Sequence, residues 1–147
     1  MTFHFLFEQS GTFKSVFKEF GHKCYDYDIL NEYNETDNVC DIFKEIEKCY
    51  NGEQSIFDNI KQDDFIIAFF PCTYFCDRNE LIFKLWNGGK RLEFSKEKCD
   101  MLIERNNDRA RFFEIYLKFC YICKSKGIKT IIENPASGGG AELFGNV

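Results

Sequence analysis

The sequence has no apolar run that approaches the roughly 18 residues needed for a membrane-spanning helix, so we expect no membrane association. Its first residues, Met1 to Phe5, contain no basic region followed by a long apolar stretch. We therefore expect no secretory signal peptide and a cytoplasmic location. In that compartment the 8 cysteines are expected to remain reduced thiols.

The sequence also lacks an excess of basic residues, because 19 Lys and Arg stand against 24 Asp and Glu and the net charge is −5. Nucleic-acid surfaces normally carry extra Lys and Arg to neutralise phosphates, so this balance argues weakly against a large one here. Internal repeats and low-complexity linkers are absent too, and the length predicts a single domain, 1–147. With 44% hydrophobic residues and 18 Phe, the chain can bury a substantial core.

The most informative stretch is the apolar run Ile66 to Phe70, which is followed by Pro71 and Cys72. A short unbroken apolar run predicts a strand buried on both faces. Pro71 ends it, because proline has no N–H for the ladder. Cys72 is then expected at the carboxyl end of a central parallel strand, the edge at which open α/β sheets bind ligands. The alternative is that Cys72 is a small core residue.

Strand and helix patterns alternate along the rest of the chain. We expect further strands at 2–7, 23–27, 39–42 and 129–132, and helices that contain Phe13 to Phe20, Phe43 to Tyr50 and Phe112 to Cys123. One helical turn is expected at 55–60, a helix at 77–86, an exposed charged segment at 90–105, an N-cap for the long helix at Asp108 and its end at Gly127. This alternation predicts an α/β fold with a mostly parallel sheet and right-handed crossovers.

Polar residues cluster in the loops expected at the carboxyl ends of the strands, namely 8–12, 26–28, 41–43, 72–77 and 133–137. Gly11 can bring backbone N–H groups close to a ligand, Asp26 or Asp28 can accept hydrogen bonds from ribose hydroxyls, and Asp41 can accept one from an exocyclic amine. Together these positions describe a site for a nucleoside-bearing cofactor. An ordinary strand-to-helix turn and solvated loop acids are the alternatives.

Cys72 and Glu133 would lie at the reactive end of such a site. Neither has a histidine nearby in the sequence, and the pair does not suit a hydrolase triad. A thiolate and a carboxyl group do suit addition to a heteroaromatic ring, in which the thiolate adds and the carboxyl group protonates a ring nitrogen.

These segments resemble the ordered motifs of DNA cytosine-5 methyltransferases, most closely the short methyltransferase-like proteins of phages and mobile elements. The resemblance is carried by Phe7-Glu8-Gln9-Ser10-Gly11-Thr12, Gly21-His22, Tyr27-Asp28-Ile29, Pro71-Cys72 and Glu133-Asn134-Pro135, and it extends from Phe3 to about Ser137. It implies a Rossmann-like S-adenosylmethionine-dependent methyltransferase domain.

The resemblance also implies roles for individual residues. Phe7, Glu8, Ser10, Gly11 and Thr12 would hold the amino-acid part of S-adenosylmethionine, Asp26 or Asp28 its ribose, and Asp41 with Ile42 its adenine, with Pro71 beside the cofactor. Cys72 would add to carbon 6 of a cytosine flipped out of DNA while Glu133 contacts ring N3.

The sequence departs from the family pattern at several points. Phe70 and Thr73 stand where proline and often glutamine are usual, and the first turn lacks the fuller glycine set. No Gln-x-Arg-x-Arg motif follows Glu133, and the last strands of the fold and a target-recognition region are missing. Three explanations remain open: a trimmed form, a minimal variant that needs a protein partner for target recognition, or an inactive remnant that binds a cofactor or a partner.

The remaining cysteines leave a redox or metal protein as a further alternative. Cys72-x-x-x-Cys76 and Cys120-x-x-Cys123 have spacings that metal sites use, but Cys120 and Cys123 fall on an apolar helix face and are expected to pack in the core. We predict no metal site. His4 is isolated in the sequence, and His22 is expected at the surface.

Overall fold

A computed structural model of the chain describes residues 1–71, 86–87, 90–91 and 94–133. Its contacts divide the chain into two units. The first consists of Met1–Pro71 with Ile115–Glu133, and the second of Cys72–Glu114 with Asn134–Val147. The predicted helix at 77–86 lies outside the described residues except for Trp86, which belongs to a strand.

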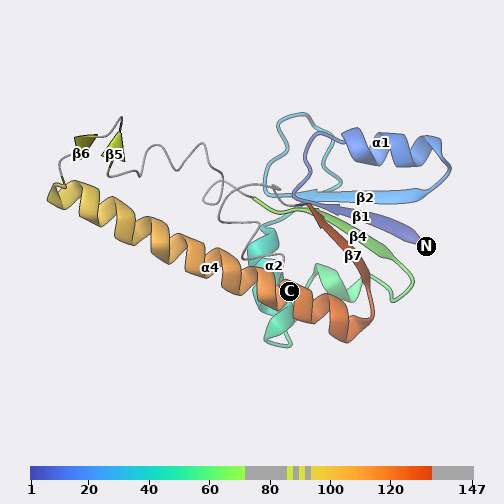
Figure 1. Ribbon diagram of the computed structural model, residues 1–147. Helices are drawn as coiled ribbons and strands as arrows, with labels where there is room; N and C mark the ends of the chain where they lie inside the picture. The colour runs from blue at the N-terminus through green and yellow to red at the C-terminus, as the bar shows by residue number, and fades with distance from the viewer. Residues whose placement is uncertain (72–85, 88–89, 92–93, 134–147) are drawn as a thin grey trace. The chain divides into compact units, whose positions relative to one another are not determined.

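The first unit is built on a five-stranded sheet whose order is β3-β2-β1-β4-β7, with every neighbouring pair parallel (Figure 1). The strands are β1 (Thr2–Leu6), β2 (Lys23–Asp28), β3 (Asn38–Val39), β4 (Phe65–Phe69) and β7 (Lys129–Glu133). The α/β class and the parallel sheet are thus confirmed. This strand order is that of a Rossmann-like, doubly wound sheet.

Helices cover both faces of this sheet. Helix α1 (Thr12–Glu19) lies on one face, and α2 (Ile42–Tyr50) with the 3₁₀ turn η1 (Ile56–Asp58) lies on the other (Figure 1). The part of α4 (Lys96–Lys126) from Ile115 onward joins α2 and η1. There Lys118 Nζ lies 2.8 Å from a carboxylate oxygen of Glu47, and the rings of Phe57 and Phe119 are 6.1 Å apart.

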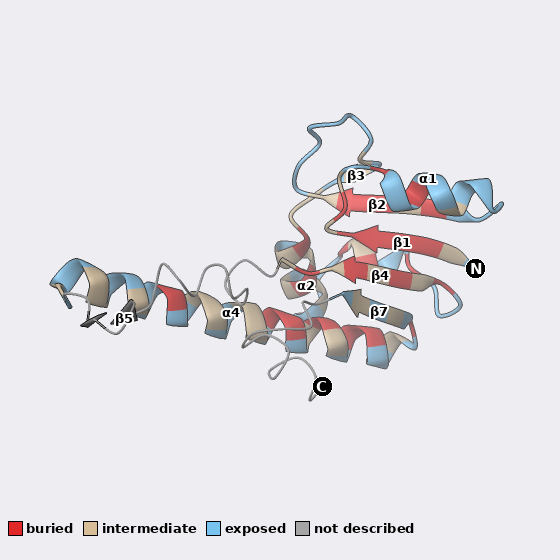
Figure 2. Cartoon of the chain, turned by 45° about the horizontal axis from the view of Figure 1, so that its top comes forward, coloured by how far each residue is buried: buried red, intermediate tan, exposed pale blue. Residues whose placement is uncertain are grey.

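Aromatic side chains fill the core on both faces of the sheet. On the α1 face the ring of Phe17 lies 4.8 Å from Phe3 and 5.2 Å from Phe5. On the other face Phe70 lies 5.6 Å from Phe119. Burial is concentrated on β1, β2 and β4, while β7, at one edge of the sheet, alternates between exposed and partly buried residues (Figure 2). The even and odd positions of the strands therefore serve two separate cores.

Two predicted boundaries are wrong. The strand predicted at 39–42 ends at Val39, because Asp41 instead caps α2 by accepting a hydrogen bond from Lys44 N at 3.3 Å. The long helix begins at Lys96, not at Asp108. Ser95 is its cap, since Ser95 Oγ accepts from Lys98 N at 3.3 Å. The segment before Asp108 was predicted only as charged and exposed, although its Lys, Glu, Met and Leu residues are good helix formers.

The long helix ends as predicted. Gly127 has φ +67, its N–H donates to the Lys124 carbonyl at 3.2 Å, and the Ile128 N–H donates to the Cys123 carbonyl at 2.9 Å. This pair of bonds is a Schellman motif, which requires a left-handed residue at the glycine position. The chain can then turn directly into β7.

The second unit contains the amino-terminal part of α4 and a short antiparallel pair, β5 (Trp86–Asn87) and β6 (Lys90–Arg91). Arg105 is buried there, so the prediction that the charged segment is exposed is wrong at this residue. Within the described ranges no helix is both long and apolar enough to cross a membrane.

Candidate functional site

The registers of the sheet bring the loops at the carboxyl ends of the strands side by side. Cys40 N–H donates to the Asp28 carbonyl, and Phe7 N–H donates to the Tyr27 carbonyl, both at 2.9 Å. On the other side of β1, Phe69 of β4 pairs with Glu133 of β7. The ends of β3, β2, β1, β4 and β7 therefore form one continuous edge in that order.

The connections diverge at the middle of this edge. The chain leaves β1 through α1 toward β2, whereas β4 lies on the opposite side of β1 and pairs with β7. The loops after β1 and β4 are thus drawn apart, and in doubly wound sheets the crevice between them is where ligands bind. The first turn, from Phe7 to Thr12, and Pro71 border this position.

The first turn is strained and partly buried. Phe7 has φ +61, which is unusual for a bulky residue and of the kind that clusters at functional sites. Glu8 is only 7% exposed, and its Oε1 accepts hydrogen bonds from Ser10 N, at 2.8 Å, and from Ser10 Oγ. Its Oε2 is buried with no hydrogen-bond partner among the described residues. A buried carboxylate oxygen without a donor is costly, so it is a place for a donor from a ligand.

The rest of this turn is closed by the chain itself. Gly11 has φ +68, and a Cβ added to it would lie 3.0 Å from Glu35 Cβ. The hydroxyl groups of Ser10 and Thr12 are hydrogen-bonded at 2.7 Å, with Ser10 Oγ as the acceptor because its one hydrogen is donated to Glu8. The loop after β2 therefore covers the turn at Gly11, and the open part of the turn is the segment before it.

A buried ion pair holds that loop in place. Lys14 Nζ lies 2.9 Å from Asp26 Oδ2 and 3.2 Å from Asp37 Oδ1, and it donates to the Glu35 carbonyl. Asp26 is fully buried, and its Oδ1 accepts from Asp37 N at 2.6 Å. Burial disfavours the charged form of Lys14, yet its bonds to Asp26 and Asp37 outweigh this and raise the pKa of the ammonium group. Burial raises the pKa of the Asp26 carboxyl group.

The structure thus separates the two acids that the sequence left as alternatives. Asp26 is enclosed and engaged by Lys14, whereas Asp28 is half-buried at the end of β2. Asp28 Oδ1 accepts from Leu30 N at 2.8 Å, and no described residue bonds its other oxygen. Asp28 is the acid that a ribose could reach.

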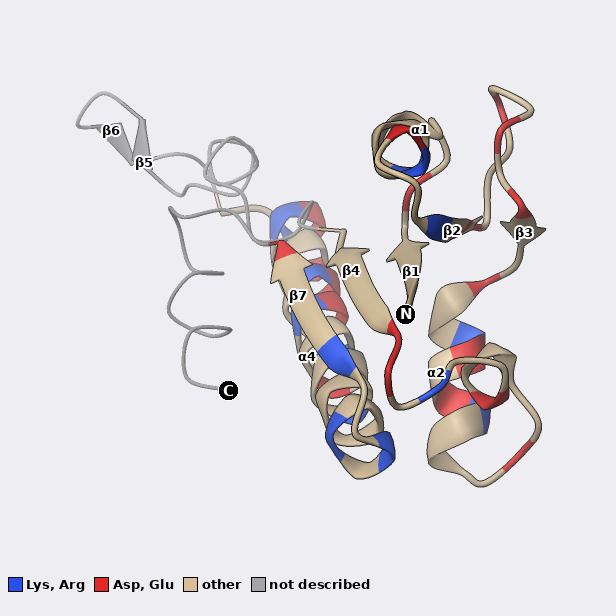
Figure 3. Ribbon diagram, turned by 90° about the vertical axis from the view of Figure 1, so that its right-hand side faces the viewer, with Lys and Arg blue, Asp and Glu red and all other residues tan. Residues whose placement is uncertain are grey.

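The next loop is organised by the start of α2. Both oxygens of Asp41 are engaged, one by Lys44 N and the other by Lys44 Nζ at 3.3 Å, although the carboxylate is still 29% exposed. Ile42 is buried in the core, and Phe43 is half-buried. Acidic residues are concentrated in the loop between β2 and β3 and at the start of α2, so this part of the edge suits a ligand with positive charge (Figure 3).

An aromatic cluster underlies the centre of the edge. The ring of Phe7 lies 5.4 Å from Phe43 and 4.8 Å from Phe70. Pro71 is half-buried directly after Phe70, and Glu133 is exposed at the end of β7. Cys72, the predicted nucleophile, lies outside the described residues.

Four of the described cysteines have a raised pKa and are therefore unreactive. Burial raises the pKa of Cys40 and of Cys123 to about 11, and it also raises the pKa of Cys24 and Cys120. These groups are thiols at neutral pH and poor nucleophiles or metal ligands. In the described part of the chain no three His, Cys, Asp or Glu side chains gather as metal ligands.

Comparison of the chain with protein-family models, with curated proteins and with solved structures gives no match in any of the three.

Several residues that shape the site carried no signal in the sequence. Lys14 lies in an ordinary helical pattern, and Glu35 and Asp37 lie in a polar loop. Only the pairing of β2 with β3, and of α1 with the same loop, makes them partners. His22 is exposed, as predicted, whereas His4 is buried.

Proposed function

We propose that this protein is an S-adenosylmethionine-dependent methyltransferase of the DNA cytosine-5 type, with its cofactor at the carboxyl edge of the sheet. The observation that carries the proposal is the Glu8 carboxylate. It is buried in the first turn, next to the point where the connections diverge, and one oxygen lacks a described partner. The cofactor's α-ammonium group is a donor that would satisfy this oxygen.

The surrounding residues fit the remainder of the cofactor. The strained backbone at Phe7 turns the chain away from the sheet at the place where the amino-acid part would lie. Asp28 retains an oxygen for the ribose hydroxyls, and the half-buried Phe43 ring offers a surface for adenine. The acidic edge suits the positive sulfonium, from which the cofactor supplies a methyl group.

The roles of Cys72 and Glu133 rest on the resemblance of Pro71-Cys72 and Glu133-Asn134-Pro135 to the family motifs. The Cys72 thiolate would add to carbon 6 of the flipped cytosine while Glu133 holds N3, which makes carbon 5 nucleophilic. In the pairing of β4 with β7, Glu133 stands opposite Phe69 at the carboxyl edge of the sheet. The net charge of −5 argues weakly against a large DNA surface on this chain, so we propose that a partner supplies part of that surface.

The first experiment is calorimetric titration of the intact protein with S-adenosylmethionine and with its demethylated product. We expect micromolar binding. Glu8→Gln preserves the bonds to Ser10 but removes the charge, and a charge-assisted hydrogen bond is worth about 1.5–3 kcal/mol. It should therefore weaken binding by roughly tenfold or more. Glu53→Gln, in the exposed loop after α2, is the matched control and should leave the affinity unchanged.

The second experiment measures methyl transfer to cytosine-containing DNA. Cys72→Ser should retain cofactor binding and lose transfer. A protein that binds the cofactor, but transfers no methyl group with or without Cys72, is instead a catalytically inactive module that binds a cofactor or a partner. Absence of binding to the folded protein refutes the proposal.

A further inference from the structure

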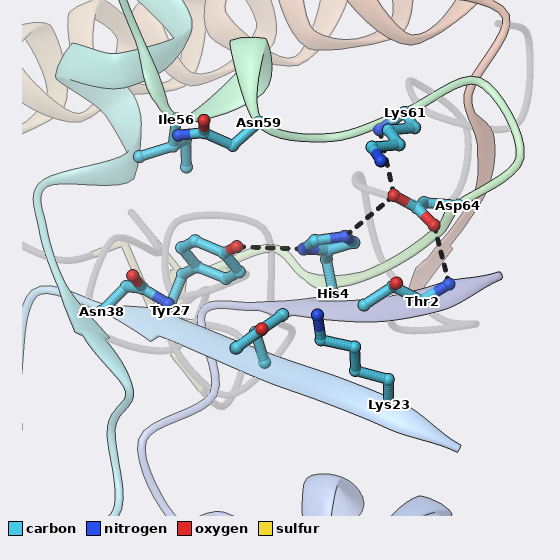
Figure 4. A pocket seen from close by; sticks show the side chains of 10 residues that line it. Thr2, His4, Lys23, Tyr27, Asn38, Ile56, Asn59, Lys61 and Asp64 are labelled. Atoms are coloured by element: carbon cyan, nitrogen blue, oxygen red, sulfur yellow. Dashed lines mark hydrogen bonds and ion pairs between the residues drawn. The ribbon is translucent and has the colours of Figure 1, made fainter.

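A pocket lies on the sheet face opposite α1, away from the carboxyl edge. It has a volume of about 320 Å³ and lies between the face of β1 and β2 and the 3₁₀ turn η1. Its walls include His4, Tyr25 and Tyr27 from the sheet and Ile56 and Asn59 from η1 (Figure 4). The volume is at the lower end of the range of small-molecule sites.

The floor of the pocket is a row of rings. The His4 ring lies 5.9 Å from Tyr25 and 5.8 Å from Tyr27, at interplanar angles of 30° and 37°. In Figure 4, Ile56 and Asn59 stand across the pocket from Tyr27 and His4. A flat ring could lie between these walls, with the Asn59 amide able to donate to and accept from its edge.

His4 has one hydrogen-bond partner in the floor, Tyr27, and lies near the carboxylate of Asp64. Its Nδ1 is 3.0 Å from the Tyr27 hydroxyl, and its Nε2 is 3.6 Å from Asp64 Oδ2, too far for a hydrogen bond. Asp64 is already bonded by Thr2 N at 2.7 Å and by Lys61 N at 3.0 Å. His4 Nε2 therefore has no hydrogen-bond partner among the described residues. Water cannot readily replace that partner, because the side chain is only 4% exposed. An unpartnered polar atom in the floor of a pocket points to a ligand.

The mouth of the pocket carries unpaired positive charge. Lys23 and Lys61 are exposed, and neither forms an ion pair with any acidic residue in the described ranges. By contrast Lys14, Lys48 and Lys118 all have carboxylate partners. Lys23 Nζ lies 5.3 Å from the centre of the Tyr25 ring, which places the ammonium group beside the row of rings. Two ammonium groups that have no carboxylate partner in the described ranges, beside a ring-lined pocket, suit a phosphate attached to a flat ring.

We infer that this pocket binds a mononucleotide, with the base between Tyr27 and Ile56 and the phosphate at Lys23 and Lys61. The site is separate from the proposed cofactor site, which uses the loops at the carboxyl ends of the strands. It therefore holds whether or not the chain is a methyltransferase.

The test is calorimetric titration of the intact protein with the four 5′-ribonucleoside monophosphates, with their nucleosides and with inorganic phosphate. At least one monophosphate should bind more than tenfold more tightly than its nucleoside and than phosphate. The double variant Lys23→Ala and Lys61→Ala changes only exposed side chains and should weaken this binding at least tenfold. Lys18→Ala, which changes an exposed side chain of α1, is the matched control and should bind like the wild type.

Three results overturn the inference. The first is that no monophosphate binds at millimolar concentration. The second is equal affinity for phosphate alone, which describes an anion site without a ring. The third is binding that the double variant leaves unchanged, because the phosphate is then not held by Lys23 and Lys61. Displacement of the nucleotide by the demethylated cofactor counts in the same way, because the nucleotide is then held at the carboxyl edge.

Discussion

The buried ion pair between Lys14 and Asp26 makes a quantitative prediction about stability. Lys14 is 4% exposed and Asp26 is fully buried, so replacing Lys14 with Met leaves a carboxylate in the core with no cation. Removing one partner of a buried pair costs about 3–5 kcal/mol. That is a large share of the roughly 5–15 kcal/mol by which single domains are stable.

The assay is urea unfolding followed by circular dichroism. At a slope of about 2 kcal/mol per molar urea, Lys14→Met should lower the midpoint by about 2 M. Adding Asp26→Asn should restore much of the loss, because the amide oxygen can still accept from Asp37 N while the buried charge is gone. Lys48→Met is the control: Lys48 pairs with Glu45 at 2.6 Å but on the surface, and its removal should scarcely move the midpoint.

The reasoning fails if Lys14→Met shifts the midpoint no further than Lys48→Met does. It also fails if the second substitution makes the protein less stable still. Either result would mean that Asp26 is satisfied without Lys14. The loop between β2 and β3 would then be held over the first turn by other contacts.

Two further predictions concern the pH dependence of stability and the backbone conformation of two glycines. Burial lowers the pKa of His4, and hydrogen bonds from Lys61 N and Thr2 N outweigh burial and lower the pKa of Asp64. The unfolded chain then binds a proton at each of these two side chains more readily than the folded chain does. The free energy of unfolding should therefore decrease as the pH is lowered below 6.5, because of His4, and decrease further as it is lowered below 3.8, because of Asp64. His4→Gln should remove the first part of the fall in urea midpoints measured across pH, and an unchanged profile would contradict this. Gly127→Ala and Gly52→Ala should both lose about 1–2 kcal/mol in urea unfolding, because each residue is left-handed. Gly127→Ala should lose more, since its Cβ would lie 3.0 Å from Gln62 Cγ whereas nothing lies within 4 Å at Gly52, and equal losses would refute the argument.

The sequence by itself determined the elements and the class of the fold. The apolar run before Pro71 and the strand patterns near the two chain ends predicted strands that the structure contains, because these signals are local and depend on the period of a few neighbouring residues. Alternation of these strands with helices then predicted a parallel sheet. The end of the long helix could be predicted from Gly127 alone, because glycine adopts the left-handed conformation that ends many helices. The misplaced start of that helix shows where local reading fails, since most residues from Lys96 to Arg105 are charged and three of the apolar ones are consecutive.

Only the tertiary structure decided which residues lie together. Asp26 and Asp28 are equivalent in the sequence, but pairing of β2 with its neighbours encloses the first against Lys14 and leaves the second at the edge. His4 was isolated in the sequence because its partners Tyr27 and Asp64 come from distant segments. Burial and pairing of this kind depend on strand order and on which face each residue takes, and no short window of sequence contains either.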